Sequence, residues 1–103
     1  MKIAIASTSK TLDGNISDKG GRAPFYLLFD KNLKLVESIK NPFSSGGGGA
    51  GFGVAKMLED KEIDTVVVEK IGGNMQTAFE SAKITLISKT GSISDYLKSL
   101  QNN

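Results

Sequence analysis

Hydrophobic residues occur in short runs along the chain, and each run has about the length of one strand or helix. Residues 2–8 combine two β-branched isoleucines with small alanines, which predicts a buried strand that packs closely on both faces. Residues 64–70 contain three consecutive valines, a pattern that favours a central strand covered on both sides. The run at 84–88 predicts a short final strand.

Two more strands are predicted at 25–30 and 33–40, joined by a tight turn at 30–32 whose Asp and Asn tolerate turn geometry. Polar and apolar positions alternate imperfectly in the second of them, so we expect it near the edge of the sheet. The segment 9–22, before this hairpin, contains only Leu12 and Ile16 as apolar residues. We expect it to be mobile in the absence of a binding partner.

Apolar residues at helical spacing predict three helices. The first runs from about 51 to 60, the second begins at Asn74 as its N-cap, and the third follows Gly91 and Ser92. Asp95 stands three residues after Ser92, which resembles a capping box. A strand, a hairpin and then alternating helices and strands predict an α/β domain with a five-stranded mixed sheet and helices on both faces.

Four loops are expected at the edge of the sheet where the parallel strands end. They are the segment 9–24, the glycine-rich stretch SSGGGGAGFG at 44–53, residues 70–74 and residues 89–92. Ligands of open α/β sheets bind preferentially at this edge. We therefore expect any binding site here.

Composition narrows the chemistry of such a site. The chain has 103 residues, enough for one domain over 1–103, and contains no cysteine and no histidine. Without cysteine the chain has no thiolate for catalysis or cluster ligation, and without histidine it lacks the commonest general base and transition-metal ligand. The net charge is +2 and spread along the chain, so nucleic-acid binding is not indicated. No apolar run is long enough for a membrane span or signal peptide, and we expect a soluble, cytoplasmic protein.

The glycine-rich stretch has two interpretations on residue pattern alone. Gly46, Gly48 and Gly51 formally satisfy the dinucleotide-binding fingerprint, and Glu69 is near the position of its ribose-binding acid. However, six glycines within eight positions produce such a pattern by chance, and no Lys-Ser/Thr follows as a phosphate-binding P-loop requires. The alternative is a flexible connector without a ligand.

A third interpretation comes from a resemblance that covers nearly the whole chain. It rests on MKIAIAS at the start, GRAPFYLLFD at 21–30, KNPF at 40–43, GAGFGVAKMLED at 49–60 and DTVVVEKIGGNMQTAFESAKI at 64–84. Together these segments resemble the dinitrogenase iron–molybdenum cofactor biosynthesis family. The resemblance implies a ribonuclease H-like, three-layer α/β fold. It also implies binding or carriage of iron–molybdenum cofactor or its precursors without catalysis.

The resemblance also implies where the ligand would bind. The segments that match the family supply Arg22, Gly49, Gly51, Gly73 and Asn74 as candidate cofactor-binding residues, and the adjoining Gly48 of the glycine-rich stretch is a further candidate. Family members commonly carry histidines before the Gly-Arg-Ala-Pro segment and in the glycine loop, and this chain has none. A guanidinium and backbone N–H groups can hold an anion, but they cannot ligate iron, so we predict no metal-ligating residues. The identity of the cofactor is not assigned, and iron–molybdenum cofactor or a precursor is the candidate that the resemblance implies.

Other residues at this edge have structural interpretations. Met75 lies in an apolar stripe and is expected in the core, and Tyr26 and Tyr96 are expected to pack. Glu69 is expected to pair with Lys70 or Arg22. Without a histidine base a serine nucleophile is not supported, and the carboxylates Asp13, Asp18 and Glu69 do not suggest a nuclease.

We therefore expect a non-enzymatic binding protein for a small anion or metal cluster. A protein-interaction module with a mobile glycine loop and a nucleotide- or phosphate-binding protein are the alternatives.

Overall fold

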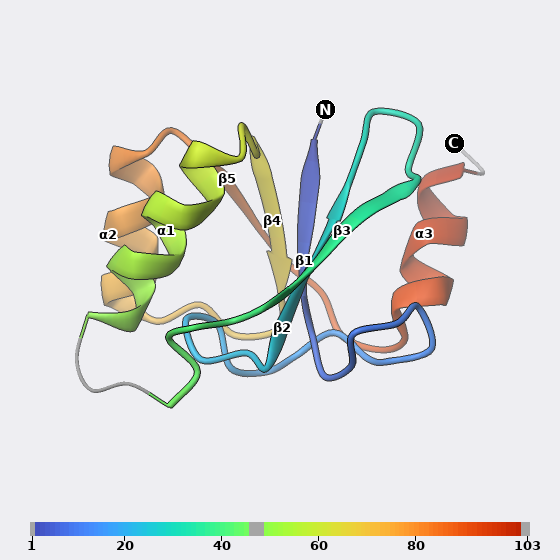
Figure 1. Ribbon diagram of the computed structural model, residues 1–103, viewed down its shortest axis with the longest axis horizontal. Coiled ribbons are helices and arrows are strands. Elements are labelled where there is room, and N and C mark those ends of the chain that lie inside the picture. The colour runs from blue at the N-terminus through green and yellow to red at the C-terminus, as the bar shows by residue number, and fades with distance from the viewer. Residues whose placement is uncertain (1, 46–48, 102–103) are drawn as a thin grey trace.

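A computed structural model describes residues 2–45 and 49–101 of the chain (Figure 1). All eight predicted elements are present and in the predicted order. They are β1 (Ile3–Ser7), β2 (Phe25–Phe29), β3 (Leu35–Lys40), α1 (Ala50–Asp60), β4 (Thr65–Val68), α2 (Gly73–Ser81), β5 (Thr85–Ser88) and α3 (Ile93–Gln101). No helix within the described ranges is both long enough and apolar enough to cross a membrane.

The strands form one mixed, open sheet in the order β3-β2-β1-β4-β5. β1 pairs antiparallel with β2 and parallel with β4, and β5 continues the parallel part. β3 lies at one edge, as its imperfect alternation predicts. The α/β class, the five-stranded mixed sheet and the helices on both faces are therefore confirmed. The finer ribonuclease H-like classification stays a prediction.

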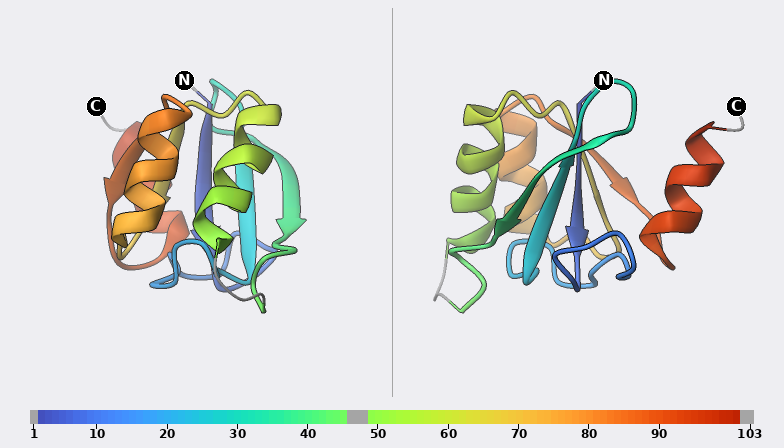
Figure 2. Two further views of the ribbon diagram at one scale, coloured as in Figure 1. Left: turned by 90° about the vertical axis from the view of Figure 1, so that its left-hand side faces the viewer. Right: turned by 45° about the vertical axis from the view of Figure 1, so that its right-hand side comes forward.

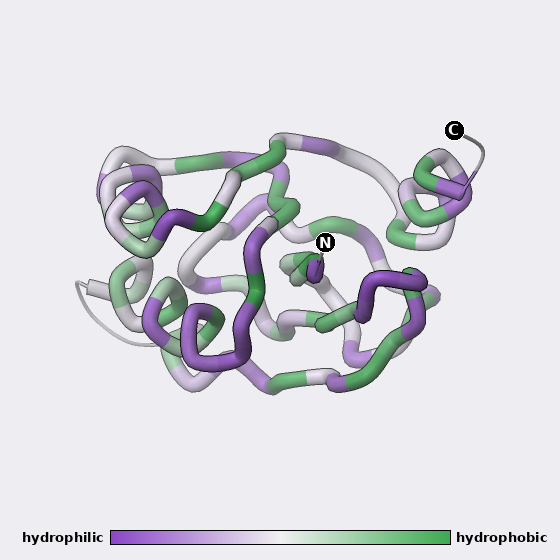
Figure 3. The backbone as a smooth tube through the Cα atoms, turned by 90° about the horizontal axis from the view of Figure 1, so that it is seen from above, coloured by the Kyte–Doolittle hydropathy of each residue, from purple (hydrophilic) through white to green (hydrophobic). Residues whose placement is uncertain are grey.

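The sheet separates two hydrophobic cores, which belong to the two helical layers. Helices α1 and α2 lie on one side of the sheet and α3 on the other (Figure 2), an arrangement that the view from above also shows (Figure 3). Ala4 and Ala6 of β1 belong to the core under α1 and α2, whereas Ile3 and Ile5 belong to the core under α3. The alternation of small and large residues along β1 therefore sets how closely each layer approaches the sheet.

The hairpin turn is longer than predicted. The Asp30 carboxylate accepts hydrogen bonds from the N–H groups of Asn32 at 2.8 Å and Lys34 at 3.1 Å, and Leu33 adopts a left-handed conformation with φ 63°. These bonds lower the pKa of Asp30, the bond from Lys34 contributing most. Leu33 and Lys34 are consequently part of the turn, and the prediction that the strand starts at residue 33 was wrong by two residues.

The segment 9–22 contacts the rest of the fold at defined points, and its expected mobility without a partner stays a prediction. Ile16 is 4% exposed and packs in the core under α3. The N–H of Ser17 donates to the carbonyl of Ala6 at 2.8 Å, and that of Ile16 donates to Gly91 at 2.9 Å. One apolar residue and backbone bonds to β1 and to the loop before α3 thus connect this segment to the fold.

Candidate functional site

A pocket of about 480 Å³ lies at the edge of the sheet where the parallel strands end. The ends of β1 and β4 that define this edge are at the bottom of Figure 1. Three of the four predicted loops meet at the pocket. The lining residues come from the end of the first loop, the start of α1 and the start of α2: Asp18, Lys19, Gly20, Gly21, Arg22, Gly49, Ala50, Gly51, Lys70, Gly72, Gly73, Asn74 and Met75. The fourth loop, 89–92, does not contribute to this lining and instead bonds to residues 14–16.

Helices α1 and α2 both begin at this pocket, and neither beginning is capped by a side chain. The N-cap residues are Gly49 and Gly72, without a side-chain capping bond, and neither first turn contains an acidic residue. By contrast, Ser92 Oγ accepts a bond from the N–H of Asp95 at the start of α3, as predicted. The helix away from the pocket is capped, while the two helices at the pocket direct uncapped N–H groups and positive dipole ends toward it.

Two buried polar side chains donate hydrogen bonds to backbone carbonyls of the loop that carries Arg22. Tyr26 is fully buried in β2, and its hydroxyl donates to the carbonyl of Gly20. Burial raises the pKa of Tyr26, so the hydroxyl keeps its proton for this bond. Asn41, 2% exposed and just after β3, donates to the carbonyls of Gly21 and Ala23, both at 2.9 Å. From the sequence, Tyr26 is expected only to pack, and no pattern distinguishes Asn41.

Glycines bring the loop and the two helices into direct contact. A Cβ on Gly21 would lie 2.8 Å from the backbone nitrogen of Gly51, and one on Gly51 would lie 3.1 Å from the Cα of Met75. A Cβ on Gly20 would lie 2.3 Å from the sulfur of Met75. These three glycines therefore have a packing role that was not predicted. Gly49 needs to be glycine for another reason, because its φ of 88° begins α1 in a left-handed conformation.

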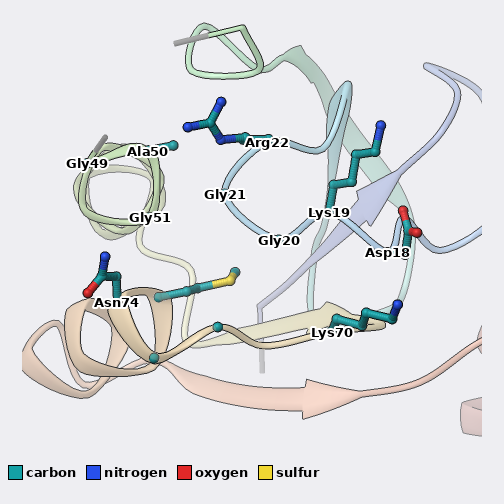
Figure 4. A pocket seen from close by; sticks show the side chains of 13 residues that line it. Asp18, Lys19, Gly20, Gly21, Arg22, Gly49, Ala50, Gly51, Lys70 and Asn74 are labelled. Carbon is teal, nitrogen blue, oxygen red and sulfur yellow. The ribbon is translucent and has the colours of Figure 1, made fainter. Parts of the chain in front are cut away.

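Three cations and one carboxylate line the pocket. Figure 4 shows the Arg22 side chain extended toward the start of α1 at Ala50, while Lys19, Lys70 and Asp18 lie on the other side of the loop. All four of these charged residues are exposed. The formal charge of the lining is therefore positive, and it adds to the field of the two helix N-termini.

The candidate residues from sequence fall into two groups. Arg22, Gly49, Gly51, Gly73 and Asn74 line the pocket together, although they come from three separate segments. Gly48, also predicted, lies outside the described residues. The predicted role of Asn74 as N-cap is wrong, because the N-cap of α2 is Gly72, two residues earlier.

Lys19 and Lys70 line the pocket and are not among the residues predicted from sequence. A signal was nevertheless present, because Lys19 precedes one glycine pair directly and Lys70 precedes another by two positions, at the same edge of the sheet.

The pocket contains few atoms that could bind a metal directly. The chain has no histidine or cysteine, and within the described ranges no three metal-ligating side chains gather at one point. Met75 is 4% exposed and packs in the core under α1 and α2, as predicted. Glu69, which the dinucleotide fingerprint would require at the ligand, is not among the lining residues.

Fold and pocket together define a small α/β protein with an open, positively charged cavity at the carboxyl edge of a mixed sheet. The profile of the dinitrogenase iron-molybdenum cofactor family matches residues 1–103, and the chain belongs to this family. The predicted resemblance is thereby confirmed. Membership associates the chain with small carrier or accessory proteins related to this cofactor.

Solved structures support the fold. The apo form of the orange protein from Desulfovibrio gigas is 20% identical with a TM-score of 0.88, and the match covers 98% of this chain and 87% of that one. A putative NifB protein from Thermotoga is also 20% identical with a TM-score of 0.81, over 99% of this chain and 88% of that one. No curated protein matches the chain significantly in sequence. At these identities the likeness concerns the fold alone.

Proposed function

We propose that this protein binds and carries, without catalysis, a small anionic ligand of the iron–molybdenum cofactor or precursor type in the pocket between α1, α2 and residues 18–22. The observation that carries the proposal is that both helices starting at the pocket lack a capping side chain. A bound anion would accept hydrogen bonds from the free N–H groups and interact favourably with both dipoles. Family membership supports the choice of ligand class.

The residues that line the pocket fit an anion that is bound through hydrogen bonds and charge, without a bond from the protein to a metal. Arg22 offers a planar fork of donors, and Lys19 and Lys70 add charge. Gly49 and Gly73 leave open space beside the backbone, Gly51 lines the pocket between them, and Asn74 adds a side-chain amide. The same residues do not fit direct ligation of iron, because thiolate and imidazole are missing from the chain. A metal-containing cargo would therefore be held through its anionic outer groups and not through thiolate or imidazole ligands from this chain.

Amide chemical shifts of the isotope-labelled protein test the proposal. We would titrate it with phosphate, molybdate, a nucleotide and an extract of iron–molybdenum cofactor at constant ionic strength. Shifts confined to residues 18–22, 49–51 and 72–75 are the expected result. If none of these ligands shifts the amides of these segments, the proposal is wrong.

Arg22→Ala should weaken binding of the anion by about 1.5–3 kcal/mol, the range for a hydrogen bond that involves a charged group. Lys31→Ala is the matched control, because Lys31 is exposed in the turn at the opposite edge and its loss changes the net charge equally. Arg22→Lys keeps the charge but not the fork and should give an intermediate loss. Equal affinities for Arg22→Ala and Lys31→Ala would mean that Arg22 does not contact the ligand.

A further inference from the structure

The last strand, β5, lies at one edge of the sheet. Within residues 2–45 and 49–101 it pairs with β4 alone, and the N–H groups of Thr85 and Lys89 donate toward β4, to Asp64 at 2.9 Å and to Val68 at 3.1 Å. Backbone groups alternate in direction along a strand, so the N–H and C=O groups of Leu86 and Ser88 point away from the sheet. An extended chain added beside β5 could pair with both residues.

A groove of about 370 Å³ runs beside this edge. It is bounded by β5 on one side and α2 on the other, and its lining residues are Ile71, Gln76, Glu80, Ile84, Thr85 and Leu86. Ile71, Ile84 and Leu86 provide an apolar floor that continues into the core under α1 and α2. Gln76 donates to the Glu80 carboxylate at 3.2 Å, and both side chains form a polar rim on the helix.

From this arrangement we propose that the groove between β5 and α2 binds an extended segment of a partner protein by strand addition. The backbone of the segment pairs with Leu86 and Ser88, an apolar side chain lies on the floor of the groove, and a basic side chain faces Glu80. Glu80 is the charged member of the described groove lining, which is why a basic residue is expected. A strand is the occupant because only an extended backbone matches the spacing of the outward groups.

The position of the groove relates the partner to the pocket. Ile71 lines the groove, and the next two residues, Gly72 and Gly73, line the pocket and begin α2. A partner strand on β5 would therefore sit against the same short segment that borders the candidate ligand site. The proposal does not depend on the ligand, because it rests on a different strand edge and cavity.

Synthetic peptides provide the first test. The probe is an acetylated, amidated heptapeptide, Thr-Lys-Val-Leu-Val-Lys-Thr, which presents Leu and two Lys side chains on one face when extended. We expect shifts and slower hydrogen exchange at the amides of Leu86 and Ser88. Two N-methylated versions follow, one modified at positions 2, 4 and 6 and the other at 3 and 5. Because alternate N–H groups face a pairing strand, one version should lose binding and the other retain it.

Variants of the protein provide the second test. Ser88→Pro removes the outward N–H, whereas Ser88→Ala keeps it and removes only the hydroxyl that bonds to the carbonyl of Glu69. Loss of one hydrogen bond should weaken binding of the probe by roughly fivefold in Ser88→Pro and leave Ser88→Ala unchanged. Glu80→Lys should weaken it by a similar factor through charge repulsion, roughly fivefold.

Three results would overturn the proposal. The first is the absence of shifts at Leu86 and Ser88 at millimolar peptide. The second is equal binding of both N-methylated peptides, which would show contact without strand pairing. The third is a concentration-dependent doubling of the molecular mass that Ser88→Pro abolishes, which would assign this edge to a second copy of the chain. The N-methylated peptides need only the unaltered protein, so the test stands even if Ser88→Pro fails to fold.

Discussion

At the scale of single residues, the glycines around the pocket differ in what a side chain would meet. Added atoms on Gly21 and Gly51 would press on backbone, which cannot move without shifting a loop or a helix. Added atoms on Gly72 and Gly73 would meet nothing within 4 Å. The first two positions therefore hold the loop against α1 and α1 against α2, while the second two leave space at the start of α2. The same residue type has a packing role in one segment and an access role in the other.

Substituting one glycine of each kind separates these roles. Gly21→Ala should lower the free energy of unfolding by about 1–3 kcal/mol, as expected for an overpacked contact. Gly73→Ala places a helix-favouring residue in open space and should change stability by less than about 1 kcal/mol, in the favourable direction. Urea denaturation of the two variants beside the unaltered protein measures both. Equal destabilisation by the two would contradict the contact between residue 21 and the start of α1.

At the scale of elements, α1 and α2 end in the same motif although neither has a glycine after its last turn. In α2 the N–H of Ile84 donates to Phe79 at 2.9 Å and that of Lys83 to Glu80 at 3.1 Å, the two bonds of a Schellman motif. In α1, Ile63 and Glu62 make the corresponding bonds. Glu62 and Lys83 adopt left-handed conformations with φ of 61° and 60°. The isoleucines that follow are both 6% exposed and lead the chain into β4 and β5.

Glycine at these positions should stabilise the protein. The left-handed conformation costs an ordinary residue about 1–2 kcal/mol, and glycine removes this cost. Glycine also has greater freedom in the unfolded chain, which lowers the free energy of unfolding by about 0.5–1 kcal/mol. Lys83→Gly should therefore raise the free energy of unfolding by about 0.5–1 kcal/mol. The adjacent Ala82→Gly should lower it by about the same amount, because Ala82 has a right-handed conformation. A thermal or urea unfolding curve for each distinguishes them, and a loss of stability in both would argue against the motif.

At the scale of the whole molecule, the hydrophobic pattern was sufficient for the elements and their layers. Three valines in β4 and alternating residues in β1 required a sheet with helices on both faces, and every element lies within a few residues of its predicted range. The pattern could not reveal that Ile16 connects the segment 9–22 to the core under α3, since a single apolar residue has no periodicity. Nor could it reveal Asn41, whose side chain bonds to residues that lie 18 and 20 positions away in sequence.

The candidate site was predictable only in part. Connectivity predicted four glycine-containing loops at one edge, and three of them meet at the pocket, where Arg22, Gly51 and Asn74 lie together. The positions of Lys19 and Lys70 depend on how the loops pack, and local sequence does not encode that packing. Absence of capping residues at two helix starts became informative only when both starts were found at one pocket.

The antiparallel half of the molecule positions the loop that faces the helical half. Tyr26 in β2 and Asn41 after β3 bond to three carbonyls of residues 20–23, and Arg22 lies within that short segment. Asn41 also accepts a bond from the N–H of Phe43 at 3.0 Å, at the start of the path toward α1. The ring of Phe43 lies so close to Gly53 that a Cβ there would be 2.5 Å from it. One buried amide thus links the loop, the edge of the sheet and the chain that leads into α1.

Asn41→Asp and Asn41→Ala should show how far this link extends. Asn41→Asp keeps the acceptor for Phe43 but removes both donors and places a charge where the side chain is 2% exposed. Each variant leaves buried carbonyls without a partner, so we expect the free energy of unfolding to fall by about 1–3 kcal/mol. Affinity for phosphate should fall in parallel, because Arg22 lies between the two carbonyls that Asn41 holds. Urea denaturation and amide-shift titration with phosphate measure the two effects on the same samples. If stability falls but the affinity of the remaining folded protein is unchanged, Asn41 supports the fold without positioning Arg22.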